Sequence, residues 1–510
     1  MLILGDSPLT IDDVVRVARK HERVKLSDAA IKRMEKSRAW VDKVLDSEKP
    51  VYGINTGFGE LSKILVPRER WESLQRNLIL SHCTGVGERF PEDISRAIIL
   101  LRANSLIQGY SGIRVEAVEC LINLLNKDIY PVIPSKGSVG SSGDLAPLSH
   151  MAAVLLGEGM VVSDGNEVPS APVLEAAGIS PIVLEAKEGL ALINGTQAMT
   201  AVAALTLYDA CNLMKTADIA AALSLEALTG TRTAFDPRIA MIRPHKGHGE
   251  TAQNVLALTE DSMIMENHAD CEKVQDAYSL RCVSQVHGAS KKALHHVIDT
   301  VNVEMNSVTD NPLVMADTGE IISGGNFHGQ PVALVMDYLK IALAELGNIS
   351  ERRTSRLVDN KLSDLPAFLT AYPGVNSGFM ILQYTAASLV SENKVLAHPA
   401  SVDSIPTSAN QEDHVSMGTI AARQAQEILE NVQYVLAIEI LAAAQGIDFL
   451  SIDGKKPGKG NKAVHKVVRS IVTHLDDDRV LSPDILAIRD AIRNESILVA
   501  AENVVGELLV

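Results

Sequence analysis

The chain has 510 residues, of which 46% are hydrophobic, 22% are charged and 4% are aromatic. This composition excludes the disordered and collagen-like classes and predicts a globular protein with an aliphatic core. Lys and Arg number 47 against 63 Asp and Glu, which gives a net charge of −16. Because this charge repels phosphate backbones and anionic lipid surfaces, we expect neither nucleic acid nor a membrane as a partner.

The N-terminus and the cysteines indicate a reducing compartment. The first residues, MLILGDSPLT, lack the positively charged region and the sustained apolar region of a secretory signal. The chain has 5 cysteines and no Cys-x-x-Cys pair, and an odd number in a chain of this length argues against a disulfide framework. We therefore expect a cytoplasmic protein.

The order of sequence patterns predicts two domains. Residues 1–195 form a mixed, loop-bearing domain, in which 160–185 is the best candidate for a small sheet or an irregular excursion. Residues 196–510 form a long-helix domain with a helical cap at its C-terminal end. Its two longest helices are expected at 197–229 and 419–445, which contain no Gly or Pro.

Long helices of this kind need partners, because their stability comes from burying a face. Charged side chains interrupt both, so we expect neither to span a membrane. The sequence therefore predicts a mainly α fold built on a helix bundle. Further helices are expected at 271–296, 331–346, 377–396 and 480–508, and a solvated loop is expected at 455–462.

A Gly- and Ser-rich stretch at 134–147, PSKGSVGSSGDLAP, contains a tripeptide that can cyclise on itself. The Gly143 nitrogen can attack the carbonyl carbon of Ser141 in a tight turn, which Gly adopts at little steric cost. Loss of water closes a five-membered ring, and a second dehydration at Ser142 leaves an exocyclic methylidene. Such a group is a carbon electrophile that needs no added cofactor. The structural alternative is a Ser/Gly turn that leads into a helix.

Two further stretches carry candidate polar groups. VYGINTGFGE at 51–60 places Tyr52 among glycines, as a general base on a mobile lid or as a packed aromatic in a hairpin-like turn. VQDAYSLRCVSQVHG at 274–288 places Gln275, Tyr278, Arg281 and Gln285 along one helical stripe. This stripe either faces water or lines a cleft in which Arg281 grips a carboxylate.

Two loop motifs, ISGGNFHGQP at 322–331 and TSANQEDHVSMG at 407–418, complete the set. Ser408 and Gln411 fit a capping box at the start of a helix. Glu412, Asp413 and His414 suggest a metal site, but adjacent residues on a helix point in different directions and no His-Glu-x-x-His motif is present. We therefore expect no metal.

Together these stretches resemble the ammonia-lyases that carry a methylidene-imidazolone group made from their own backbone, and in particular their histidine branch. The resemblance runs from about residue 50 to residue 420. It rests on seven motifs in the family's order, which are YGINTGFG, LSHCTGVG, GSVGSSGDLAPLSH, INGTQAM, QDAYSLRC, GGNFHG and SVDSIPTSANQEDHVSMG.

The resemblance implies that Ser141, Ser142 and Gly143 form the group and that Tyr52 removes the β-proton of the substrate. It implies that the other site residues surround the electrophile and the amine (Asn194, Gln275, Tyr278), hold the carboxylate (Arg281), and bind the imidazole (His82, Glu412) or pack beside it (Phe327). Ser81, which forms with His82 the pair typical of the histidine branch, is implied to bind the substrate as well. The family's tripeptide usually begins with Ala, so Ser141 is a departure. The ring takes only backbone atoms from this residue, so we expect cyclisation to survive, while the extra hydroxyl needs a partner.

The reaction implied is elimination of ammonia from L-histidine to give trans-urocanate, with no external cofactor. The implied architecture is the long-helix bundle of the fumarase/aspartase-like superfamily with a smaller mixed N-terminal active-site domain. The resemblance also implies a homotetramer in which each active site is assembled from three chains. The alternatives are a lyase or an aminomutase acting on another aromatic amino acid, or a cofactor-free amine elimination from a histidine derivative.

Overall fold

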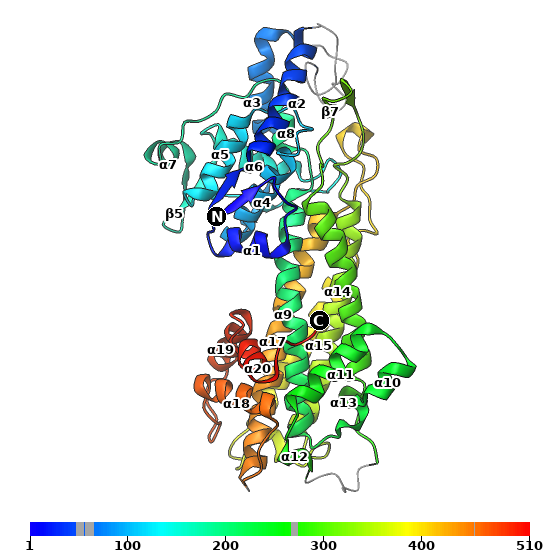
Figure 1. The fold of residues 1–510 in the computed structure, drawn as a ribbon. Coiled ribbons are helices and arrows are strands. Elements are labelled where there is room, and N and C mark those ends of the chain that lie inside the picture. The colour runs from blue at the N-terminus through cyan, green and yellow to red at the C-terminus, as the bar shows by residue number, and fades with distance from the viewer. Residues whose placement is uncertain (47–55, 57–65, 267–273, 453) are drawn as a thin grey trace. The chain divides into compact units, whose positions relative to one another are not determined.

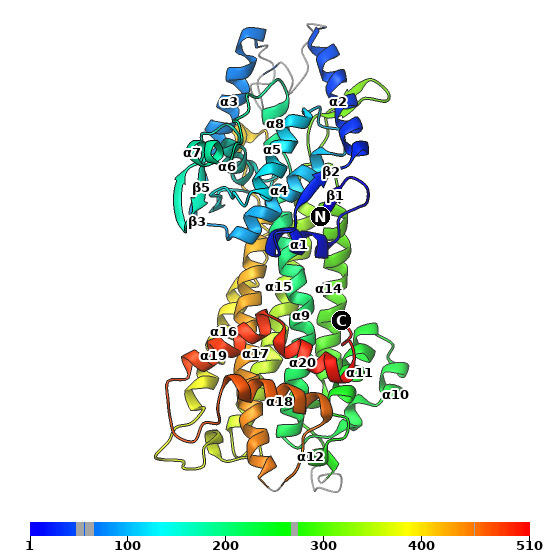
Figure 2. The same ribbon diagram turned by 60° about the vertical axis from the view of Figure 1, so that its left-hand side comes forward.

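The structure is a computed structural model that describes residues 1–46, 56, 66–266, 274–452 and 454–510 (Figures 1 and 2). Helices make up most of it and the strands are short, which confirms the predicted mainly α fold. The chain packs into two compact units, each formed from three stretches. The first unit contains Met1–Tyr208, Ile298–Asp337 and Pro399–Arg423, and the second contains Asp209–Val297, Tyr338–His398 and Gln424–Val510.

The first unit combines short helices with two-stranded sheets. Its sheets pair β1 (Leu2–Leu4) with β2 (Val24–Leu26), β3 (Val86–Arg89) with β4 (Pro134–Lys136), β5 (Met160–Ser163) with β6 (Asn166–Pro169), and β7 (Leu313–Met315) with β8 (Glu320–Ile322). Its complete helices are α1 (Ile11–Arg19), α2 (Asp28–Asp46), η2 (Arg68–Arg70), α3 (Trp71–His82), α4 (Glu92–Leu106), α5 (Val115–Asn126), α6 (Leu145–Leu155), α7 (Ser170–Ala176), α8 (Glu188–Ile193) and η5 (Ser408–Asn410).

Three helices of the first unit pack against one another beside the loop that contains residues 141–143. Helix α3 contacts α6 and α8, and α6 also contacts α8. Apolar side chains such as Ile79, Leu148 and Ile193 are fully buried at these helices. The loop between β4 and α6 contains the tripeptide 141–143, and α8 ends directly before Asn194. The packing of α3, α6 and α8 therefore fixes the chain segments on which the candidate site depends.

The second unit is almost entirely helical. In both views, the parts of the long helices that belong to this unit run alongside one another (Figures 1 and 2). These are α9 (Gln197–Ala227), α14 (Val283–Met305), α15 (Gln330–Val358) and α17 (Gly418–Ser451), each of which has its other end in the first unit. The remaining helices are η3 (Arg232–Phe235), α10 (Pro237–Ile242), α11 (Lys246–Leu258), α12 (Met263–Glu266), α13 (Tyr278–Arg281), η4 (Ala367–Leu369), α16 (Met380–Leu396), α18 (Lys459–Ile471), α19 (Ser482–Arg493) and α20 (Ser496–Val505).

Buried polar contacts connect the long helices of the second unit. Glu439 on α17 accepts hydrogen bonds from Arg353 Nε on α15 at 2.5 Å and from Ser224 Oγ on α9 at 2.6 Å, and all three side chains are buried. A buried charge is tolerated only when it is paired and hydrogen-bonded, and breaking such a pair typically costs about 3–5 kcal/mol. These contacts fix the register of the bundle as well as its packing.

The long helices agree with the sequence prediction, and the shorter ones differ in part. Helix α9 begins at the expected residue, whereas α15 continues to Val358, well past the expected end at 346. The helix expected at 480–508 is divided into α19 and α20 because Glu495 adopts φ 65°. The predicted loop at 455–462 is wrong from Lys459 onward. There α18 begins, and the buried Asn461 side chain donates a hydrogen bond to Glu226 at 2.8 Å.

Helix α17 is long and apolar enough to cross a membrane when it is assessed by length and composition alone, which the sequence argument did not anticipate. No other helix in the described part of the chain meets this condition. However, 72% of its most apolar window is buried inside the structure. This burial is typical of a core helix in a bundle.

Candidate active site

The loop from 137 to 144 makes a tight turn that requires glycine at two positions. Gly140 has φ +68° and Gly143 has φ +71°, both in the left-handed region. A Cβ at Gly143 would lie 2.0 Å from the carbonyl oxygen of Gly195, and one at Gly140 would lie 2.3 Å from Ser416 Oγ. The main chain at 143 therefore touches the main chain at 195, which no other residue type would allow.

Asp144 anchors the C-terminal side of this turn. Its side chain is fully buried and accepts hydrogen bonds from Ser138 Oγ at 2.8 Å, Thr419 Oγ1 at 2.5 Å and the Met199 nitrogen at 2.7 Å. Its own nitrogen donates to the Gly195 oxygen at 2.7 Å. Burial raises the pKa of Asp144, and the hydrogen bonds it accepts oppose this shift. This carboxyl group therefore connects the turn itself to the segments that contain Met199 and Thr419.

Asn194 lies on the other side of the turn with one unused oxygen. Its Nδ2 donates to the Asn311 oxygen at 3.0 Å, and its main-chain oxygen accepts from the buried Arg102 Nη1 at 3.0 Å. Its Oδ1 is buried and has no hydrogen-bond partner among the described residues. Because an unpaired buried polar atom is costly, this oxygen marks a place where a further polar group is expected.

A cavity of about 580 Å³ opens beside the tripeptide in the first unit. Most of the residues that line it are polar, including Ser141, Ser142 and Asn194. The other lining residues come from α8, from the loops at 311 and 323–328, and from 411–414, and they are Leu190, Asn311, Ser323, Gly324, Phe327, His328, Gln411, Glu412, Asp413 and His414.

A second cavity of about 280 Å³ adjoins the same loop. Ser81 and His82, the last residues of α3, line it together with Gly143. Ser141 and Glu412 line both cavities. The structure therefore brings together eight of the predicted site residues, namely Ser81, His82, Ser141, Ser142, Gly143, Asn194, Phe327 and Glu412.

A main-chain hydrogen bond orients the imidazole of His82. Its Nδ1 lies 2.8 Å from the Leu78 oxygen, and because a carbonyl only accepts, Nδ1 carries a proton and Nε2 is the acceptor of the neutral ring. Burial lowers the pKa of His82, while the Leu78 hydrogen bond and the charge of Glu412 oppose the shift. Next to it, burial raises the pKa of Cys83 to about 11, so this thiol stays protonated and is no nucleophile.

We expect Glu412→Gln to lower the pKa of His82 further, because the substitution removes the charge that opposes the effect of burial. The check is an NMR titration of His82, with Asp413→Asn as the control, since Asp413 also lines the cavity but does not shift His82. Since the folded-state pKa lies below the usual value of about 6.5, His82 reduces the free energy of unfolding only as the pH falls below that value. An unchanged or raised pKa in Glu412→Gln would contradict this arrangement.

Glu412 lies directly after η5, in a segment where the chain pairs with itself. Thr407 and Glu412 form an antiparallel bridge, in which the Thr407 nitrogen donates to the Glu412 oxygen at 2.9 Å. The predicted capping box at Ser408 and Gln411 is wrong. Ser408 starts a single 3-10 turn with φ 52°, and no α-helix follows until Gly418.

Three residues that line the cavity, His328, His414 and Asn311, were not among the predicted site residues. His328 and His414 stack with ring centroids 5.7 Å apart and planes inclined by 5°. Asn311 positions the loop before Phe327, because its Oδ1 accepts from the Gly324 nitrogen at 2.7 Å. The motifs at 322–331 and 407–418 signalled the two histidines, whereas only the structure brings Asn311 to the cavity.

Gln275, Tyr278 and Arg281 belong to the second unit and line neither cavity of the first. They also do not form one helical stripe, which corrects the sequence prediction. Gln275 precedes α13, which covers only Tyr278–Arg281, and the chain turns at Cys282 before α14 begins. Tyr278 is 70% exposed, and the Arg281 guanidinium lies 4.6 Å from its ring centroid.

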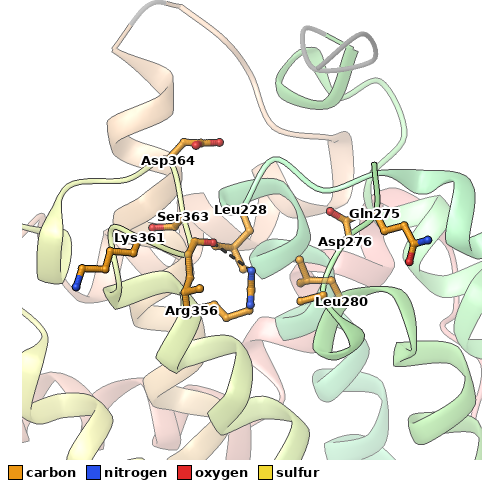
Figure 3. Close-up of a pocket in the computed structure, with 10 residues that line it drawn as sticks. Leu228, Gln275, Asp276, Leu280, Arg356, Lys361, Ser363 and Asp364 are labelled. Atoms are coloured by element: carbon orange, nitrogen blue, oxygen red, sulfur yellow. Dashed lines mark hydrogen bonds between the residues drawn. The ribbon is translucent and has the colours of Figure 1, made fainter. Parts of the chain in front are cut away.

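Gln275 lines a separate cavity of about 240 Å³ in the second unit (Figure 3). Figure 3 shows Gln275, Asp276 and Leu280 on one side and Arg356 on the other, where Arg356 Nη2 donates to the Leu362 oxygen at 3.3 Å. The second unit therefore has a polar pocket of its own beside the Gln275 segment. Tyr52 lies outside the described residues.

Comparisons with known proteins agree with this geometry. The sequence profile of the aromatic amino acid lyase family matches residues 9–470, so the chain belongs to this family. It is 54% identical to the histidine ammonia-lyase of Alkaliphilus oremlandii over 99% of both chains.

Solved structures show the same fold. Histidine ammonia-lyase from Trypanosoma cruzi is 43% identical with a TM-score of 0.91, over 98% of this chain and 95% of that one. Tyrosine aminomutase from Streptomyces globisporus is 39% identical with a TM-score of 0.93, over 98% of both chains. The fold is therefore shared by members of the family whose reactions differ.

Proposed function

We propose that the protein is a histidine ammonia-lyase, which eliminates ammonia from L-histidine without oxidation and releases trans-urocanate. One observation carries this choice within the family. The polar groups His82 and Glu412 line the cavity walls around the tripeptide, where a benzene ring would offer no hydrogen-bond donor to Glu412. The full-length similarity to histidine ammonia-lyases supports the same substrate.

We further propose that Ser141, Ser142 and Gly143 mature into a 4-methylidene-imidazol-5-one. The fit of the residues supports this, because the turn at Gly143 leaves no room for a Cβ and the unpaired Oδ1 of Asn194 lies in the wall of the cavity beside it. When formed, the group supplies an electrophilic carbon that draws electrons from the substrate. No external cofactor is required.

The chain's own side chains bind and orient the substrate. Glu412 accepts the imidazole N–H, Phe327 packs beside the ring, and His82 lines the adjoining cavity. Asn194 holds the amino end near the tripeptide. Tyr52 takes the β-proton as general base, which requires its pKa to fall from the usual value of about 10.

The remaining roles require other copies of the chain. Gln275 and Tyr278 would contact the amine and Arg281 would hold the carboxylate, and we propose that a homotetramer brings them to sites shared between chains. Exposed large apolar side chains on α15 and α16 support association, because such side chains are often buried when chains associate. They are Tyr338 (45% exposed), Ile341 (51%), Ile381 (59%) and Tyr384 (60%).

We propose that the protein is cytoplasmic and has neither nucleic acid nor a membrane as a partner. The net charge of −16 supports the absence of these two partners, because it repels phosphate groups and anionic lipids.

The test is a substrate panel with identification of the products. We expect L-histidine to give trans-urocanate, followed by its near-ultraviolet absorbance, and L-phenylalanine and L-tyrosine to give no product. Formation of cinnamate or coumarate would indicate an aromatic lyase, and a β-amino acid would indicate an aminomutase. Amine release from a quaternary histidine derivative by a chain that keeps its full mass would indicate cofactor-free elimination. Any of these without urocanate would refute the proposal.

A further inference from the structure

The side chain of Ser141 contacts a group that is not part of the turn. Ser141 is 5% exposed, and its hydroxyl donates a short hydrogen bond to Glu412 Oε2. Thr407 Oγ1 donates to the same oxygen at 3.1 Å. These are two neutral donors on one oxygen of a carboxylate. Within the described part of the chain, Glu412 Oε1 accepts no hydrogen bond.

In this arrangement Glu412 Oε2 is hydrogen-bonded within the chain and Glu412 Oε1 is available to a ligand. A glutamate side chain has several rotatable bonds, and ordering it costs conformational entropy. Hydrogen bonds to a charged acceptor are the strong ones, so two of them on Oε2 restrict Glu412 before a ligand arrives. Oε1 is then left to accept one N–H in the cavity that both Ser141 and Glu412 line.

We propose that Ser141 is a positioning residue that determines the preference for an imidazole ring, by fixing Glu412 so that its Oε1 receives the ring N–H. This inference rests on the proposed function. Cyclisation uses only main-chain atoms of residue 141, so the side-chain hydroxyl persists in the mature chain. One residue therefore contributes to the electrophile with its backbone and to substrate recognition with its side chain.

The inference predicts a loss that depends on the ligand. Ser141→Ala removes one of the two hydrogen bonds that hold Glu412 Oε2 and leaves only the one from Thr407, so the ligand must order more of the Glu412 side chain. We expect urocanate to bind roughly tenfold or more weakly, the size that corresponds to one such bond. Cinnamate, which carries a benzene ring in place of the imidazole, makes no hydrogen bond to Glu412, and its dissociation constant should change little.

The experiment measures ligand binding without turnover, so that it does not depend on the mature electrophile. Dissociation constants of urocanate and cinnamate are measured by calorimetry for Ser142→Ala and for the double variant Ser141→Ala/Ser142→Ala. The matched control is Ser323→Ala/Ser142→Ala, because Ser323 lines the same cavity but its hydroxyl contacts Asn311 at 3.2 Å. The expected result is a weaker urocanate complex in the Ser141 double variant alone.

The outcomes separate the inference from the proposed function. Equal urocanate affinity with and without Ser141, or parallel losses for urocanate and cinnamate, would overturn the positioning role and leave the lyase assignment intact. Failure of Ser142→Ala to prefer urocanate over cinnamate would overturn the choice of histidine as substrate and the inference with it. In the active protein, Ser141→Ala should raise KM for histidine more than it lowers kcat.

Discussion

Ser142→Ala is expected to reduce turnover of histidine by at least roughly 10³-fold while leaving the fold intact, because it removes the atom from which the methylidene carbon forms. Ser142 is half-buried in the wall of the larger cavity, and no described residue depends on its side chain for a hydrogen bond. The measurements are kcat with histidine, intact mass, and the unfolding midpoint.

The neighbouring serine supplies the control for this variant. Ser141→Ala keeps the atoms that form the ring and the methylidene, so its mature mass should still lie two water molecules below that of its translated sequence. Ser142→Ala should keep at least one of these waters. Wild-type turnover in Ser142→Ala would show that the reaction does not use the electrophile.

Tyr52→Phe should lower kcat by about 10²–10⁴-fold, which is the usual contribution of a positioned proton-transfer group. The substitution removes the phenolic oxygen and keeps the aromatic ring. The mature mass and the affinity for urocanate should stay at their wild-type values, since Tyr52 neither forms the electrophile nor contacts the imidazole in the proposed arrangement.

Tyr110→Phe is the matched control for the proposed base, because Tyr110 is 41% exposed and lines neither cavity of the first unit. We expect its kcat to equal that of the wild type. A Tyr52→Phe enzyme with unchanged kcat would require another base. A loss of kcat together with a loss of the two-water mass difference would instead assign Tyr52 to maturation.

Local sequence patterns predicted the long helices of the fold. The uninterrupted runs at 197–229 and 419–445 became α9 and α17, because good helix formers and the absence of Gly and Pro determine helix formation directly. The break at Glu495 and the early start of α18 were missed. Both depend on tertiary contacts, such as the one between Asn461 and Glu226, that leave no periodic signal. The division of the chain into domains at residue 195 stays a prediction.

At the candidate site, too, local spacing predicted some features and only the structure shows the others. The spacing of Ser141, Ser142 and Gly143 indicated the cyclisation chemistry, and the structure adds the close approach of Gly195 that makes the turn tight. The sequence showed that the hydroxyl of Ser141 needs a partner, but its partner is 271 residues away in the chain. Contacts of this range are set by the packing of the first unit and cannot be obtained from local spacing.

The proposed elimination of ammonia requires that the backbone of residues 141–143 has closed into a ring. The most direct measurement is the mass of the intact purified chain, followed by the mass of the peptide that contains these three residues. We predict a deficit of two water molecules that maps to this peptide in protein that converts histidine to urocanate. A full, unmodified mass in protein with the same turnover would contradict the central claim.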